Sequence, residues 1–254
     1  MDTQFLLSLI VGIFVGGVAG FLGSLMLGRR MALAAGPLGH LTLPGIALAL
    51  MYGFDVSLGA FPFVILGIVL IWLFEMRTKL PMEALTALVF ASGVAIAFLL
   101  LPVKQAEAAL VGDITKVRLG EAVISVCVAL LLFFVVKNIY SKIVLINISE
   151  ELAKSEGVNI RKYNLIYLGS IAIIVALGVK MVGGLLTAAL VAIPASSARN
   201  LSRNLVQYSF GAMIIGIISS SMGILVYKIT GFPAGPLIIL ASTSIFLISM
   251  IFKR

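Results

Sequence analysis

The only histidine in the chain, His40, carries the side chain best suited to bind a transition-metal ion. It lies in the segment 34–45, where Gly36, Pro44 and Gly45 would interrupt a regular helix. At membrane depth, irregular backbone is tolerated only where it is buried in protein or lines a cavity. We therefore expect His40 either to face a pathway or ligand, or to lie half-solvated at a helix end and bond a neighbouring carbonyl.

Two acidic residues, Glu107 and Asp113, lie in the joint 102–118 between two apolar runs. Carboxylates at the mouth of a pathway could meet an arriving cation. The alternative, that both are solvated loop residues, fits the sequence equally well.

The rest of the chain offers no side chains for enzymatic chemistry. It has no Walker A sequence, no paired carboxylates and no cluster of His and Cys. One histidine and one cysteine, Cys127, cannot build a His/Cys-rich zinc site. We expect a protein that is not an enzyme and binds no cofactor of its own. Any energy source is then ion coupling or a partner subunit.

Composition indicates a polytopic all-α membrane protein. Of the 254 residues, 61% are hydrophobic and 11% charged, and the mean hydropathy is +1.21. The net charge of +8 does not indicate nucleic-acid binding, because the basic residues cluster at the ends of apolar runs, as on membrane helices.

The apolar runs predict about nine membrane spans in one domain over residues 1–254. A span needs about 20 mostly apolar residues. The second and seventh runs are weak or interrupted, so eight spans would also fit. The expected spans are 5–27, 32–53, 57–74, 82–101, 119–136, 163–179, 182–198, 205–227 and 236–252.

The basic residues set the expected orientation. Most of the 18 Lys and Arg residues fall in the C-terminal tail and in alternate joints, which places that side in the cytoplasm. With nine spans the N-terminus lies outside and the C-terminus inside. The joints concerned are 28–31, 75–81, 137–162 and 199–204.

The polar stretch 137–162 lies on this cytoplasmic side, and it contains the signals of one short helix at 149–157. Ser149 can cap its first turn, and Glu150 and Glu151 lie where the helix dipole favours negative charge. Gly157 can take the left-handed conformation that ends a helix. We interpret this helix as a contact for a soluble partner; an ordinary solvated loop is the alternative.

Small residues predict close packing elsewhere. Gly12, Gly16 and Gly20 recur at four-residue spacing in the first span. Gly183, Gly184 and Pro194 bracket a span of small residues. There we expect Ser196 and Ser197 to bond the carbonyls that Pro194 frees.

The sequence resembles the permease subunits of ABC-3 type importers for zinc, manganese and iron. The match runs in order from about residue 5 to residue 252, and each motif alone is weak. It is carried by 29–48 around Gly39-His40-Leu-Thr-Leu-Pro44-Gly45, by Leu110-Val-Gly-Asp113, by the 149–157 helix, by 182–199 with Pro194-Ala-Ser-Ser, and by Pro233-Ala-Gly-Pro236.

The resemblance implies a type II ABC importer permease in the cytoplasmic membrane of a prokaryote. Two permease copies would pair, and two ATPase subunits that bind ATP would dock from the cytoplasm. An extracytoplasmic solute-binding protein would deliver a divalent metal. The 149–157 helix would be the coupling helix, with Ser149, Glu150, Glu151, Ala153 and Gly157 at the ATPase contact.

One departure keeps other interpretations open. The family pattern has Asp four residues before the histidine and Ser directly before it, whereas this chain has Gly36 and Gly39. Only His40 is then left from the family's pathway metal site. An importer of the same architecture for a metal chelate or other small solute is the nearest alternative. An ion-coupled secondary transporter is a further alternative. Such a transporter usually needs acids or paired charges deep in its spans, whereas Glu83 and Glu121 lie near span ends.

Overall fold

The computed structural model describes residues 3–28, 41–54, 56–78, 80, 82–100, 112, 114–184 and 186–252. Every regular element in this part is a helix, as expected for an all-α membrane protein. The elements are α1 (Thr3–Gly28), α3 (Leu43–Tyr52), α4 (Val56–Arg77), α5 (Met82–Leu100), the 3-10 turn η2 (Ile114–Lys116), α7 (Leu119–Ile148), α8 (Glu150–Ser155), α9 (Ile160–Val182), α10 (Thr187–Leu201), α11 (Leu205–Thr230) and α12 (Ala234–Ile251).

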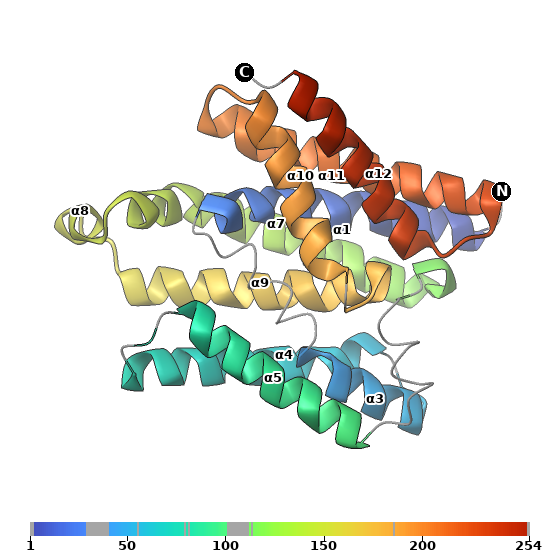
Figure 1. The fold of residues 1–254 in the computed structure, drawn as a ribbon, viewed down its shortest axis with the longest axis horizontal. Helices are drawn as coiled ribbons and strands as arrows, with labels where there is room; N and C mark the ends of the chain where they lie inside the picture. The colour runs from blue at the N-terminus through green and yellow to red at the C-terminus, as the bar shows by residue number, and fades with distance from the viewer. Residues whose placement is uncertain are drawn as a thin grey trace.

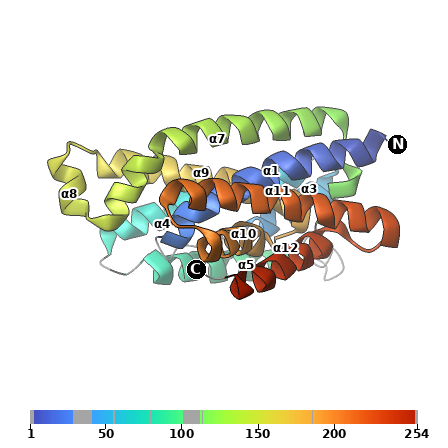
Figure 2. The same ribbon diagram turned by 90° about the horizontal axis from the view of Figure 1, so that it is seen from above.

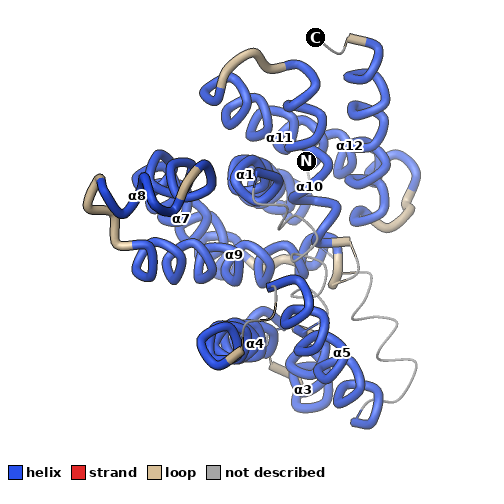
Figure 3. Tube along the Cα trace, turned by 60° about the vertical axis from the view of Figure 1, so that its left-hand side comes forward, coloured by secondary structure: helices blue, strands red, loops and turns tan. Residues whose placement is uncertain are grey.

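The helices form two groups on either side of α9 (Figures 1 and 3). Helices α3, α4 and α5 pack together on one side, and α4 rests against α9. Helices α1, α7, α10, α11 and α12 lie on the other side, with α1 at the centre of that group (Figure 3). The bundle is therefore built around α1 and α9, each of which has more than half of its residues buried.

The glycine face of α1 packs against α11, as the four-residue spacing predicts. A Cβ atom on Gly20 would lie 2.2 Å from the carbonyl oxygen of Ala212, and one on Gly16 would lie 2.9 Å from that of Gly216. Each glycine thus lets the two backbones touch. Since lipid is as apolar as the helices, this contact has to come from close packing.

The count of nine spans is not confirmed. Five helices in the described part are long and apolar enough to cross a membrane: α1, α7, α9, α11 and α12. Shorter apolar stretches lie within α4 and α5, over Leu58–Phe74 and Ala87–Ile96. Of the second expected span, 32–53, the structure describes only 41–53, which include α3.

The seventh expected span, 182–198, is not one continuous helix. Gly183 ends α9 with a φ of 84°, and α10 begins only at Thr187. With 15 residues, α10 is about 22 Å long, which is shorter than the hydrocarbon core of about 30 Å.

Helix α7 extends well beyond its expected end at residue 136. It runs to Ile148 and so includes the first twelve residues of the polar stretch 137–162. The continuation is amphipathic: Ile139, Ile143 and Ile146 are buried at four- and three-residue spacing, whereas Lys137 and Lys142 are exposed. Packing of this apolar face against the bundle keeps the segment helical. The expected end at residue 136 was wrong because it was set by the length of the continuous apolar run, which does not detect an amphipathic helix.

The α1–α11 contact predicts the effect of one added methyl group. Gly20→Ala would place a Cβ against backbone atoms of Ala212, which cannot rotate away. We expect it to lower the stability of the folded protein by about 1–3 kcal/mol. Thermal unfolding in detergent would report this as a lower Tm.

Gly169→Ala in α9 is the matched control, because no atom lies within 4 Å of its Cβ position. Alanine is a better helix former than glycine, so this variant should unfold at the same temperature or higher. Equal Tm values for wild type, Gly20→Ala and Gly169→Ala would contradict the packing account.

Candidate functional site

Helix α8 is the short helix expected in the polar stretch, and its first turn is capped as expected. The Oγ of Ser149 accepts a hydrogen bond from the backbone N–H of Leu152 at 3.2 Å. Glu150 and Glu151 lie in the first turn and Lys154 in the last. Each of the three charges therefore interacts favourably with the helix dipole and stabilises the helix. A helix of six residues would not be stable in isolation, and these caps supply part of the stability that a longer helix would have.

A left-handed glycine ends α8. Gly157 has a φ of 73°, its N–H donates to the carbonyl of Lys154 at 3.0 Å, and the N–H of Val158 donates to the carbonyl of Ala153 at 2.9 Å. This pair of bonds is the Schellman motif. The two residues that usually make its apolar contact, Ala153 and Val158, are both buried. Asn159 then caps α9 through the N–H of Lys162 at 3.1 Å.

The position of α8 makes it accessible. It lies at one end of the long axis, where α7 and α9 meet, and projects past the rest of the bundle (Figures 1 and 2). Glu150, Glu151 and Leu152 are exposed, whereas Ala153 faces inward and is fully buried. Of the expected contact residues, Ala153 therefore holds the helix in place, and the others have an exposed side for a partner.

Four expected site residues lie outside the described part of the structure: His40, Glu107, Asp113 and Gly36. Within the described ranges, no group of three or more His, Cys, Asp or Glu side chains could hold a metal ion. The interpretation of His40 as a pathway residue stays a prediction.

The expected helix break near Pro44 falls earlier than Pro44 itself. The turn is at Thr42, and Pro44 lies in the first turn of α3, where its missing N–H costs nothing. Gly45 has a packing role instead: its Cβ would lie 2.0 Å from the carbonyl oxygen of Gly59, so α3 and α4 cross backbone to backbone.

Gly112 and Gly183, which are distant in the sequence, lie in contact with each other. Gly112, in the 110–113 motif, has a φ of 64°, and its Cβ would lie 2.3 Å from the backbone nitrogen of Gly183. Gly183 also ends α9, and Gly184 forms the following turn. The sequence analysis did not foresee this contact, although both positions carry glycine in motifs that bracket span ends.

Pro194 lies inside α10, but the expected repair of its lost hydrogen bond is wrong. Proline at 194 frees the carbonyl of Leu190, four residues earlier. The hydroxyl groups of Ser196 and Ser197 instead donate to the carbonyls of Ala192 (2.8 Å) and Ile193 (2.9 Å), each four residues earlier in the helix. Each hydroxyl is satisfied locally, so neither is left to reach Leu190.

An ion pair at the other end of α7 was not anticipated. The Nζ of Lys180, in the last turn of α9, lies 2.5 Å from a carboxylate oxygen of Glu121, in the first turn of α7. Both side chains are largely buried, with exposed fractions of 17% and 28%. The pair joins α7 to α9 at the end opposite α8, so these two helices are linked at both ends.

Comparison with known proteins agrees with this architecture. The chain is 27% identical over 266 residues to the high-affinity zinc uptake system membrane protein ZnuB of Buchnera aphidicola subsp. Baizongia pistaciae, covering 100% of this chain and 99% of the relative. It is 26% identical over 253 residues to the manganese import system permease protein ScaB of Streptococcus gordonii, covering 98% and 91%.

A solved structure shares the fold. PsaBC from Streptococcus pneumoniae in complex with Fab superposes with a TM-score of 0.85 at 24% identity, over 98% of this chain and 91% of that one. The model of the ABC 3 transport family matches residues 1–253. The chain therefore belongs to the ABC 3 transport family.

Proposed function

We propose that the chain is the membrane-spanning permease subunit of an ABC importer that moves zinc, manganese or iron into the cytoplasm. Family membership over 1–253 and relatives named for zinc uptake and manganese import support the substrate class. The observation that carries the mechanism is α8, a capped helix that projects from the bundle where a soluble subunit can reach it. The three metals share nitrogen and oxygen ligands, so the permease sequence does not distinguish them.

The proposal includes partners that this chain does not supply. A separate ATPase subunit binds and hydrolyses ATP, a second permease copy completes the pathway, and an extracytoplasmic solute-binding protein delivers the metal. The chain lies in the cytoplasmic membrane of a prokaryote, with its N-terminus outside and α8 inside. In this arrangement His40 contacts the metal on its path, and Glu107 and Asp113 meet it on the outer side.

The contacts of α8 suggest how ATP binding reaches the spans. Ala153 and Val158 are buried against α7 and α9, so a force on α8 moves the ends of both helices. The Lys180–Glu121 ion pair holds the far ends of the same helices together. Movement of α8 therefore shifts α7 and α9 as one unit and switches access from outside to inside.

The serine cap of α8 gives a first test. Ser149→Ala removes the acceptor for the Leu152 N–H, at a cost of about 1 kcal/mol of helix stability. We expect ATP-driven metal uptake in membrane vesicles to fall severalfold, with little change in Tm, because the loss is confined to a surface helix. Ser149→Asp restores an acceptor at the cap and should restore uptake. Loss of uptake in both variants would contradict the proposal that uptake depends on the hydrogen bond at the cap of α8.

Metal content of cells tests the substrate. Cells that lack this chain should accumulate less of one metal among zinc, manganese and iron, and the wild-type chain should restore it. His40→Ala should fail to restore it at matched expression. Unchanged content of all three metals would contradict the metal proposal and favour an importer of another solute.

A further inference from the structure

The side chain of Leu41 lies in a notch between α4 and α5 that two glycines form. A Cβ atom on Gly67 of α4 would lie 2.5 Å from Cδ1 of Leu41, and a Cβ atom on Gly93 of α5 would lie 2.5 Å from its Cδ2. Each branch of the leucine therefore occupies the place of one missing side chain. Leu41 and both glycines are buried, so one forked side chain joins two helices.

The backbone that follows Leu41 is held in place as well. The N–H of Ile46 donates to the carbonyl of Thr42 at 2.9 Å, so helical hydrogen bonding begins directly after Leu41. One turn later α3 touches α4 backbone to backbone, because a Cβ atom on Gly59 would lie 2.2 Å from the carbonyl oxygen of Gly45. Leu41 thus begins a segment that is packed against α4, and it adds a contact to α5.

Leu41 directly follows His40 in the chain. A trans peptide bond holds consecutive Cα atoms about 3.8 Å apart, so an anchor at Leu41 limits where the backbone of its neighbour can lie. Side chains that bind a ligand must be held within about 0.5 Å of their productive geometry by residues whose own rotamers are locked by packing. The notch locks Leu41 in this way.

We propose that Leu41 is the positioning residue for His40, and that Gly67 and Gly93 are the two positions that hold it. This inference rests on the function proposed above, in which His40 contacts the metal on its path. While both methyl groups of Leu41 stay in the notch, the backbone beside His40 keeps its place relative to α4 and α5. Without the notch, the ATPase cycle continues but moves less metal.

A hollow beside the notch separates this role from the stability of the fold. It has a volume of about 210 Å³ and is lined by Leu41, by Phe63 on α4 and by Ile96 on α5, among other residues. A leucine that is pushed out of the notch has room to rotate into this hollow. Its displacement therefore costs little folding free energy, unlike that of backbone atoms.

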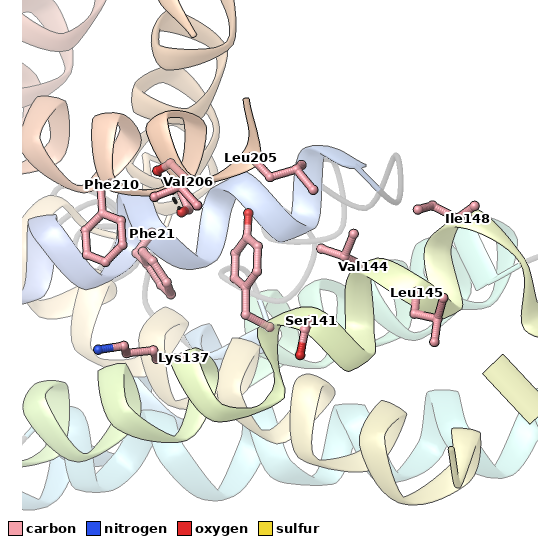
Figure 4. Close-up of a pocket in the computed structure, with 11 residues that line it drawn as sticks. Phe21, Lys137, Ser141, Val144, Leu145, Ile148, Leu205, Val206 and Phe210 are labelled. Carbon is pink, nitrogen blue, oxygen red and sulfur yellow. Dashed lines mark hydrogen bonds between the residues drawn. The ribbon is translucent and has the colours of Figure 1, made fainter. Parts of the chain in front are cut away.

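The wider groove between α1, α7 and α11 has a different surrounding (Figure 4). Its volume is about 420 Å³. Phe21 on α1 and Phe210 on α11 line it, and they lie within the expected spans 5–27 and 205–227. Lipid covers an apolar lining at this level, so the groove indicates no partner.

Gly93→Ala tests the notch. Carbon atoms in contact lie about 3.5–4.0 Å apart, so the added Cβ moves Cδ2 of Leu41 by about 1 Å or more. Gly67→Ala displaces the other branch in the same way and is an independent second variant. Gly169→Ala in α9 is the matched control, because no atom lies within 4 Å of its Cβ position.

A triple variant, Leu41→Val with Gly67→Ala and Gly93→Ala, refills the notch from the other side. Valine has no Cδ atoms, and the two added methyl groups take their place. They would lie 3.5 Å and 3.6 Å from the position of Cγ in Leu41, which is ordinary van der Waals contact. The packing is then restored without the forked side chain.

Metal uptake and ATP hydrolysis would be measured together in vesicles that contain the permease, its ATPase subunit and the metal-loaded binding protein. We expect each single notch variant to lower the ratio of metal moved to ATP hydrolysed at least threefold. The concentration of binding protein that gives half the maximum rate should change less than twofold, and the Tm should stay that of the wild type. Gly169→Ala should leave the ratio unchanged, and the triple variant should recover at least half of the loss.

An unchanged ratio in both single variants would overturn the inference while leaving the proposed function standing. So would a proportional fall of uptake and hydrolysis with a lower Tm, because the notch would then be a structural contact only. A triple variant no better than the single ones would also overturn it. If the wild type showed no ATP-dependent metal uptake, both proposals would fall.

Discussion

Close contact between the backbones of α1 and α11 is the constraint on which the rest of the bundle depends. Inside a bilayer the hydrophobic effect does not hold helices together, so they associate through packing and hydrogen bonds. The face of α1 that carries Gly16 and Gly20 provides that packing, with carbonyl groups of α11 in the space that side chains would fill. Gly23 extends the same face to α10, where its Cβ would lie 2.1 Å from the carbonyl oxygen of Val191. Helix α1 thus fixes where both later helices lie.

The second constraint is that interrupted backbone in a membrane must find partners within the protein. The break between α9 and α10 meets it locally. The N–H of Gly183 donates to the carbonyl of Val179 at 2.8 Å, and the Oγ1 of Thr187 donates to the carbonyl of Gly183 at 2.7 Å. Gly112 packs against the same point. The break is therefore a defined corner at which Gly112 meets the 182–184 segment, rather than an unfilled gap between helices.

Local signals in the sequence predicted local structure well. The cap at Ser149, the left-handed Gly157 and the glycine face of α1 each depend on residues within one helix, and each is confirmed. The end of α7 could not be placed, because its last twelve residues are polar enough to end a span while one face stays apolar against the bundle. The Lys180–Glu121 pair and the Gly112–Gly183 contact join residues about 60 to 70 positions apart. Nothing in one sequence distinguishes such pairs from other lysines, acids and glycines.

Uptake by reconstituted vesicles tests the central claim most directly. The purified chain would be inserted into liposomes with its ATPase subunit, the metal-loaded solute-binding protein placed on one side and ATP on the other. The account predicts zinc, manganese or iron accumulation that requires ATP hydrolysis and the binding protein together. Accumulation driven by an imposed proton or sodium gradient without ATP would contradict it, because the chain would then be a secondary transporter.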